Sequence, residues 1–203
     1  MNINTGFSTV TKLLLLAVSL FATPAFAHTE TGVAGGLISG FLHPIYGLDH
    51  LVAMVAVGLW GAQLGKPAIW LLPITFPLVM AFGGVLGVAG FPLPAIEMGI
   101  ALSALVLGIM VLFSARPPLA LAALIVGFFA VFHGYAHGAE LPGAANPLAY
   151  GVGFVISTGL LHLAGIGLGV LTRWPLGTQA IRGLGGMIAA LGVYFSAASA
   201  GWM

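Results

Sequence analysis

Long runs of hydrophobic residues dominate the chain, and short segments rich in Pro and Gly separate them. Most runs are about as long as the roughly 20 residues that an α-helix needs to cross a membrane. They are too long and continuous for the strands of a membrane barrel. The pattern therefore predicts an all-α, polytopic transmembrane helical bundle in one domain. The six expected helices cover residues 33–64 (with a break near Pro44), 68–89, 95–113, 119–137, 148–171 and 179–200.

The first 27 residues follow a different pattern, typical of a secretory signal peptide. Lys12 precedes an apolar run at residues 13–20, and Ala25-Phe26-Ala27 supplies the small-x-small pattern that signal peptidase accepts. This run is shorter than a membrane-spanning helix requires. We expect a cleaved signal peptide at residues 1–27 and one transmembrane domain at residues 28–203; an uncleaved anchor is the alternative.

Composition identifies lipid as the solvent of this chain. Hydrophobic residues make up 60% of it and charged residues only 4%, whereas a soluble domain carries about 25% charged residues. The chain has no cysteine, which excludes disulfides and thiolate metal sites. It has no basic run that would indicate nucleic-acid binding and no P-loop sequence for ATP.

The basic residues predict the orientation. If the signal is cleaved and six helices follow, every cation of the mature chain faces the cytoplasm, as the positive-inside rule requires. These cations are Lys66, Arg116, Arg173 and Arg182. Trp60, Trp70 and Trp174 lie near them in sequence and predict an interfacial belt.

Glycines four residues apart predict close helix–helix contacts, because small residues let two backbones approach each other. A homo-oligomer formed through these faces is a further expectation. The pairs are Gly36/Gly40, Gly61/Gly65, Gly83/Gly87 and Gly165/Gly169.

The first cluster of ionisable residues is the segment at residues 43–50, HPIYGLDH. Pro44 suits the first turn of a helix, with His43 near its N-terminus. On an unbroken helix, His43 and His50 would share one face, and Asp49 would lie about 100° from His50. Imidazole and carboxylate groups suit divalent transition metals. The alternative is an Asp–His pair that joins two helices by a hydrogen bond.

The second cluster, at residues 132–140, reads FHGYAHGAE. His133 and His137 are four residues apart on one helical face, a spacing that allows both to bind one ion. Glu140 follows three residues later, where it can bind the ion or accept a hydrogen bond from His137. The sequence has no HExxH motif, so a zinc protease is not supported.

Three further residues lie in apolar helices. We expect Glu97 in the ion path, because an acid in a lipid-embedded helix is costly, although a helix N-terminus also favours an acid. His162 is interpreted as a helix–helix hydrogen bond, with a relay on the exit route as the alternative. Phe76, between Pro73 and Pro77, can line a path at a broken helix or be an ordinary lipid-phase aromatic.

Together the two clusters resemble the HupE/UreJ family of nickel permeases, which are associated with hydrogenase and urease maturation. His43, Pro44, Gly47, Asp49 and His50 match the family's first motif. Its second motif is matched by Phe132, His133, Gly134, Ala136, His137, Gly138 and Glu140. The resemblance covers the whole chain. It implies uptake across a bacterial inner membrane, nickel as the ion, and ligand roles for His43, Asp49, His50, His133, His137 and Glu140.

Residues 28–203 are therefore interpreted as a metal permease of the inner membrane, with a periplasmic N-terminus and no enzymatic activity. We expect nickel to be the substrate, with cobalt as the alternative, and no cofactor. The expected partners are the ion and the lipid bilayer, with no nucleic acid. Glu97 joins the expected metal site as a source of negative charge. One rival is a membrane accessory or sensor protein that delivers metal without transport. An intramembrane hydrolase is another, but it lacks an evident nucleophile.

Overall fold

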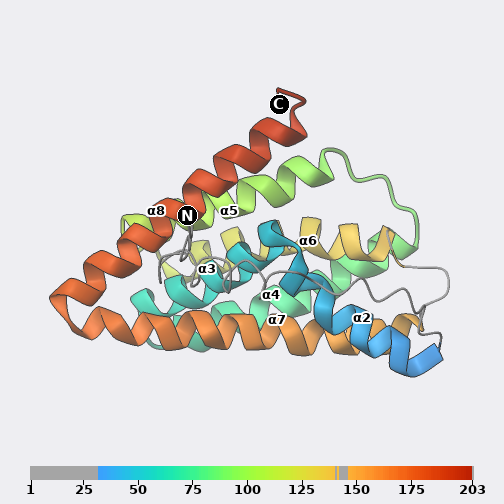
Figure 1. The fold of residues 1–203 in the computed structure, drawn as a ribbon, viewed down its shortest axis with the longest axis horizontal. Helices are drawn as coiled ribbons and strands as arrows, with labels where there is room; N and C mark the ends of the chain where they lie inside the picture. Colours follow the sequence, from blue (N-terminus) through green and yellow to red (C-terminus); the bar gives the residue numbers. More distant parts are fainter. Residues whose placement is uncertain (1–31, 140, 142–145, 203) are drawn as a thin grey trace, which may run out of the picture. The chain divides into compact units, whose positions relative to one another are not determined.

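The computed structural model describes residues 32–139, 141 and 146–202. These residues form α-helices and one 3-10 helix, and they contain no strand (Figure 1). The expected all-α class is therefore confirmed. The predicted signal peptide and Glu140 lie outside the described residues. The elements are α2 (Gly32–Tyr46), α3 (Leu48–Leu64), α4 (Ala68–Val88), α5 (Ile96–Leu112), α6 (Leu119–Ala139), α7 (Pro147–Gly169), η1 (Val170–Arg173) and α8 (Pro175–Ser199).

By length and composition, four segments can cross a membrane: α4, α6, α7 continued through η1, and α8. Helices α2 and α3 meet at a bend of 79° and pass the same test only as a pair. Helix α5 is apolar, but its 17 residues make it shorter than these spans. The chain thus has the helices of a polytopic membrane protein, while the count of six spans stays a prediction.

Helices pair closely across this bundle: α4 packs against α6, α5 against α8, and α7 against both α2 and α3 (Figure 1). Glycines allow the α4–α6 pair. A Cβ at Gly83 would collide with the carbonyl of Val131, and a Cβ at Gly134 would collide with that of Met80. The two backbones therefore touch, as the spacing predicted for Gly83.

The glycine pairs serve contacts inside the chain. A Cβ at Gly40 would meet the carbonyl of Tyr150 in α7, and a Cβ at Gly165 would meet that of Val55 in α3. These faces are consequently covered and give no support to the expected homo-oligomer. Gly65 has another role: it caps α3 at a positive φ of 77°, where glycine avoids the steric penalty, and nothing approaches it.

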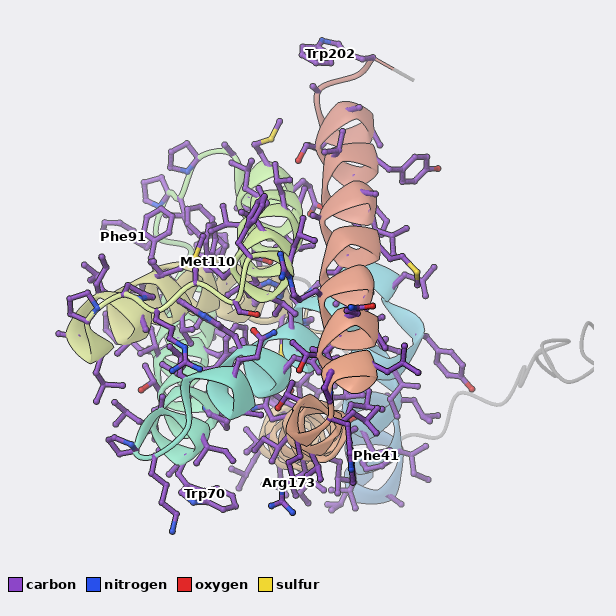
Figure 2. All side chains as sticks on the ribbon, turned by 90° about the vertical axis from the view of Figure 1, so that its left-hand side faces the viewer. Phe41, Trp70, Phe91, Met110, Arg173 and Trp202 are labelled. Atoms are coloured by element: carbon purple, nitrogen blue, oxygen red, sulfur yellow. The ribbon has the colours of Figure 1, made fainter. Side chains whose placement is uncertain are left out.

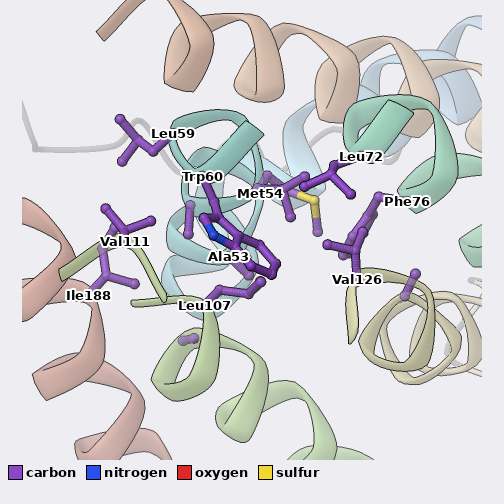
Figure 3. Packing of buried hydrophobic residues seen from close by; sticks show 14 of the residues in the cluster. Ala53, Met54, Leu59, Trp60, Leu72, Phe76, Leu107, Val111, Val126 and Ile188 are labelled. Carbon is purple, nitrogen blue, oxygen red and sulfur yellow. The ribbon is translucent and has the colours of Figure 1, made fainter. Parts of the chain in front are cut away.

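Apolar side chains cover the outside of the helices as well as the core (Figure 2). Ile74, Leu78 and Phe82 on α4 are each more than half exposed, which suits a surface in contact with lipid. The core is also apolar and contains Met54, Leu72 and Phe76 (Figure 3).

Trp60 corrects the expected interfacial belt. It is fully buried in the core (Figure 3). Its Nε1 donates a hydrogen bond to the carbonyl of Ala115 at 2.9 Å. Trp70 and Trp174 are both about half exposed and remain compatible with an interfacial position.

The break between α2 and α3 falls at Gly47, three residues beyond the expected position. Pro44 lies in the last turn of α2, and the placement of Pro44 and His43 in a first turn was wrong. Pro44 has no N–H to donate to the carbonyl of Gly40, which weakens this turn. Gly47 then adopts an extended conformation and begins the new direction of α3. A Cβ there would lie only 3.2 Å from Asp49 Oδ1 and 3.4 Å from His50 Nδ1.

Candidate metal centre

Four histidines from the two sequence clusters meet beside the α2–α3 break. The ring centroids of His50 and His133 are 4.6 Å apart, those of His50 and His137 also 4.6 Å, and those of His43 and His137 4.7 Å. His43 and His50 would be about 10 Å apart along an unbroken helix. The bend at Gly47 reduces their ring separation to 6.2 Å. Folding therefore joins two segments that lie more than 80 residues apart in sequence.

The cluster is shielded by the surrounding helices. His133 is fully buried, and His50 and His137 are each 7% exposed. The Phe154 ring of α7 lies 4.0 Å from that of His137, and the Tyr150 ring lies 6.1 Å from that of His43. These aromatic walls hold the imidazoles close together.

Asp49 fixes the orientation of His50. Asp49 Oδ1 lies 2.8 Å from His50 Nδ1 and also accepts a hydrogen bond of 2.8 Å from the backbone N–H of His50. A carboxylate oxygen accepts hydrogen bonds, so Nδ1 carries the proton. In a neutral ring this leaves the lone pair on Nε2, which is buried and has no partner. A carboxylate behind a histidine is the arrangement that commonly prepares this side chain for a metal.

Ser103 of α5 does the same for His133. Its hydroxyl donates to the carbonyl of Ile100 at 2.6 Å and lies 2.8 Å from His133 Nε2. The single hydroxyl proton is already used, so Ser103 accepts a hydrogen bond from Nε2–H. The lone pair of His133 therefore resides on Nδ1, which has no partner. The sequence analysis missed this role of Ser103, because no motif accompanies it.

His137 completes the set of unsatisfied nitrogens: both its Nδ1 and its Nε2 are buried without a hydrogen-bond partner. A buried polar atom without a partner costs about 1–3 kcal/mol. Several such atoms within one cluster are therefore a poor structural solution. They are suited to a ligand that accepts electron pairs, namely a metal cation.

The rings do not coordinate an ion as they stand. Within the described part of the chain, no group of three or more His, Asp or Glu side chains is arranged to hold a metal. The rings meet edge to face. However, imidazole nitrogen binds transition metals at about 2.0–2.1 Å, so two rings at right angles around one ion have centroids roughly 4.5 Å apart. The observed separations near 4.6 Å match this value, and ring rotation is the change that binding requires.

Glu97, which was expected in the metal site, and His162, which was not, both lie outside the cluster. Glu97 lies in the first turn of α5, where it is exposed, and it makes no hydrogen bond or ion pair with any described residue. His162 is buried in α7 and contacts the cluster indirectly, through the ring of Phe76. The broken helix that one of the two interpretations of Phe76 required is absent: α4 continues through Pro73 and Pro77.

A cavity of about 750 Å³ lies between α4, α6 and α7 and reaches His137. It also borders Ala89 at the end of α4 and Pro147 at the start of α7. The cavity therefore connects the histidine cluster with the end of the bundle that is remote from the cations. Its walls are almost entirely apolar.

Comparison with known proteins agrees with this architecture. The family model described as HupE / UreJ protein matches residues 16–195. Protein HupE of Rhizobium leguminosarum bv. viciae is 44% identical over 176 residues, which are 86% of this chain and 92% of that protein. No solved structure matches. Since the family model covers most of the sequence and includes both histidine motifs, this chain belongs to the HupE/UreJ family.

Proposed function

We propose that this protein is an uptake permease for nickel in the bacterial inner membrane. It captures the ion through His43, His50, His133 and His137, and it releases the ion to the cytoplasm. The observation that carries this proposal is the buried convergence of these histidines, with two lone pairs oriented by Asp49 and Ser103. Imidazole donors suit nickel, and the family resemblance favours nickel over cobalt.

Acidic residues provide the charge that balances a dication. Asp49 belongs to the proposed site and stands directly behind His50. We assign Glu140 to the same site from its motif, and Glu97 to the entry path, where an exposed acid in the first turn of α5 attracts cations. A partly dehydrated dication would otherwise be costly within the membrane.

The membrane potential can drive transport without an ATPase in this chain. An inside-negative potential contributes about 2.3 kcal/mol per charge per 100 mV, or roughly 4.6 kcal/mol for a dication. This corresponds to roughly thousand-fold accumulation at equilibrium.

The decisive experiment is uptake of radioactive nickel into sealed proteoliposomes that contain only this protein. We expect uptake to rise with an inside-negative potential, and nickel to be preferred to zinc and manganese; cobalt is the closest competitor. Tight nickel binding without uptake would instead identify an accessory protein that delivers metal. If the protein neither binds nickel nor takes it up, the proposal is rejected.

The proposed orientation has its own test. We expect the connection at Lys66 to face the cytoplasm and the segment at Asn146 to face the periplasm, because the cations of the mature chain gather at the first end. Single cysteines at these positions should react with a membrane-impermeant thiol reagent from opposite sides of intact spheroplasts. Equal labelling from outside would contradict this orientation.

A further inference from the structure

His162 of α7 is a buried histidine that the outer cluster does not include. It is 1% exposed, and neither ring nitrogen has a hydrogen-bond partner. Its ring lies beside the backbone of Pro73 in α4 but closes no hydrogen bond of ordinary geometry. The α7–α4 contact considered from the sequence is therefore present, but it leaves both ring nitrogens without a hydrogen bond of ordinary geometry, and the burial of this polar ring has room for a further reason.

The carbonyl of Pro73 has no hydrogen-bond donor within its own helix. In an unbroken α-helix this carbonyl would accept a bond from residue 77, but Pro77 has no N–H to donate. Freed carbonyls at prolines in membrane helices are tolerated when another group satisfies them. In transporters, such carbonyls serve as cation ligands.

Thr158 adds a third donor. It lies one turn before His162 on the same face of α7, is fully buried, and its Oγ1 has no hydrogen-bond partner. The imidazole and the Pro73 carbonyl thus border one cavity between α4 and α7, and the Thr158 hydroxyl lies one helical turn from the imidazole. The hydroxyl and the carbonyl are neutral, and the imidazole is neutral when it is not protonated. The outer cluster, by contrast, includes the carboxylate of Asp49.

A single aromatic ring separates this region from the outer cluster. The Phe76 ring lies 5.4 Å from that of His133 on one side and 5.5 Å from that of His162 on the other. Phe76 is fully buried and packs in the apolar core (Figure 3). Along α7, His162 lies about 12 Å beyond Phe154, which contacts the outer cluster. The two histidine regions therefore follow each other across the bundle.

A second cavity leads from His162 toward the end of the bundle where Lys66 lies. It measures about 330 Å³ and is bordered by His162, Pro73 and Trp70, which is in the first turn of α4. It shares Val155 and Ile156 with the cavity that reaches His137. The outer cavity borders one histidine region, and the inner cavity borders the other.

We infer that His162, Thr158 and the Pro73 carbonyl form an inner station for the same divalent transition-metal cation. This inference rests on the proposed transport function and adds a second site to it. The inner station binds more weakly, because no carboxylate balances the charge there. An outer site that captures the ion tightly, followed by an inner site that binds it more weakly, permits release of the ion. Conduction requires sites that the ion can leave.

The test compares nickel binding and nickel uptake of the full chain. The variants are His162→Phe and His162→Leu, which keep an apolar side chain in the core and remove both nitrogens, and Thr158→Val. Ser157→Ala is the matched control, because Ser157 is also a buried hydroxyl without a partner on α7. Equilibrium dialysis in detergent measures the bound nickel, and proteoliposomes measure the flux.

We expect the unmodified protein to bind nickel in a tight and a weaker class. Both His162 variants should lose the weaker class and slow uptake by at least roughly tenfold, the scale on which losing a supporting residue acts. They should keep the tight class, which shows that the fold is intact. Thr158→Val should have a smaller effect, and the Ser157 control none.

The inner station is overturned if both His162 variants keep two binding classes and normal uptake, or if the unmodified protein binds and transports nickel through a single class. If the unmodified protein neither binds nor transports nickel, the proposed function itself fails. The two failures are thus distinguishable.

Discussion

Polar groups near the two ends of α3 differ in whether they have hydrogen-bond partners. At its C-terminal end, side chains bond carbonyls in the last turn of α5 and just beyond it. Trp60 bonds the carbonyl of Ala115, Gln63 bonds that of Val111, and Arg182 of α8 bonds that of Leu112. Helix ends leave such carbonyls without partners inside the helix. Beside the N-terminal end of α3, His50, His133 and His137 instead have buried ring nitrogens without a hydrogen-bond partner among the described residues.

This difference distinguishes polar groups that stabilise the fold from polar groups that we propose bind nickel. Hydrogen bonds from side chains to carbonyls at helix ends hold the helices in place and satisfy backbone groups, as membrane proteins require. Here Gln63 Oε1 is the exception, as it is buried without a partner. The histidine end gathers several unsatisfied nitrogens within one cluster, which is the arrangement expected where a bound ion supplies the missing partner. Substitutions at the first end should therefore change stability, and those at the second should change nickel binding.

The largest effect on nickel binding is expected for His137→Ala. His137 offers two unpartnered nitrogens and stands between His43 and His50. Removing residues that merely support a ligand already weakens metal binding 10–100-fold, so we expect a loss of more than about 100-fold. Equilibrium nickel binding in detergent measures this loss. Tyr135→Phe is a control on the same helix, and an unchanged affinity of His137→Ala would remove this residue from the site.

The sequence predicted the fold class and the two halves of this cluster well, because both depend on local patterns. Apolar runs of sufficient length define the helices, and four-residue spacing places His133 and His137 on one face. The break lies at Gly47 rather than at Pro44, because the missing N–H of Pro44 weakens its turn without fixing the residue at which the helix ends. Trp60 was misplaced because its partner, Ala115, is 55 residues away.

A smaller loss of affinity is expected for Ser103→Ala. Without the hydroxyl, His133 Nε2–H loses its acceptor and the ring can exchange tautomers, so Nδ1 no longer always presents its lone pair. Nickel affinity should fall by about 10-fold or somewhat more. Ser103 acts as a positioning residue, so its effect should disappear in a chain that already carries His133→Ala. Additive losses in that double-mutant cycle would show that Ser103 acts independently of His133.

The smallest effect on nickel should come from the structural end of α3. Trp60→Phe keeps an aromatic ring in the core but leaves the carbonyl of Ala115 without its 2.9 Å hydrogen bond. Losing a half-buried hydrogen bond of this kind costs about 0.5–1.5 kcal/mol of stability. Thermal inactivation in detergent should therefore occur at lower temperature, while nickel affinity of the folded protein stays unchanged. The reason is that Trp60 lies three turns along α3 from His50 and contacts the end of α5, away from the cluster. A large loss of nickel affinity with normal thermal stability would break the distinction between the two ends, because it would give a fully hydrogen-bonded group the role that we assign to unsatisfied ones.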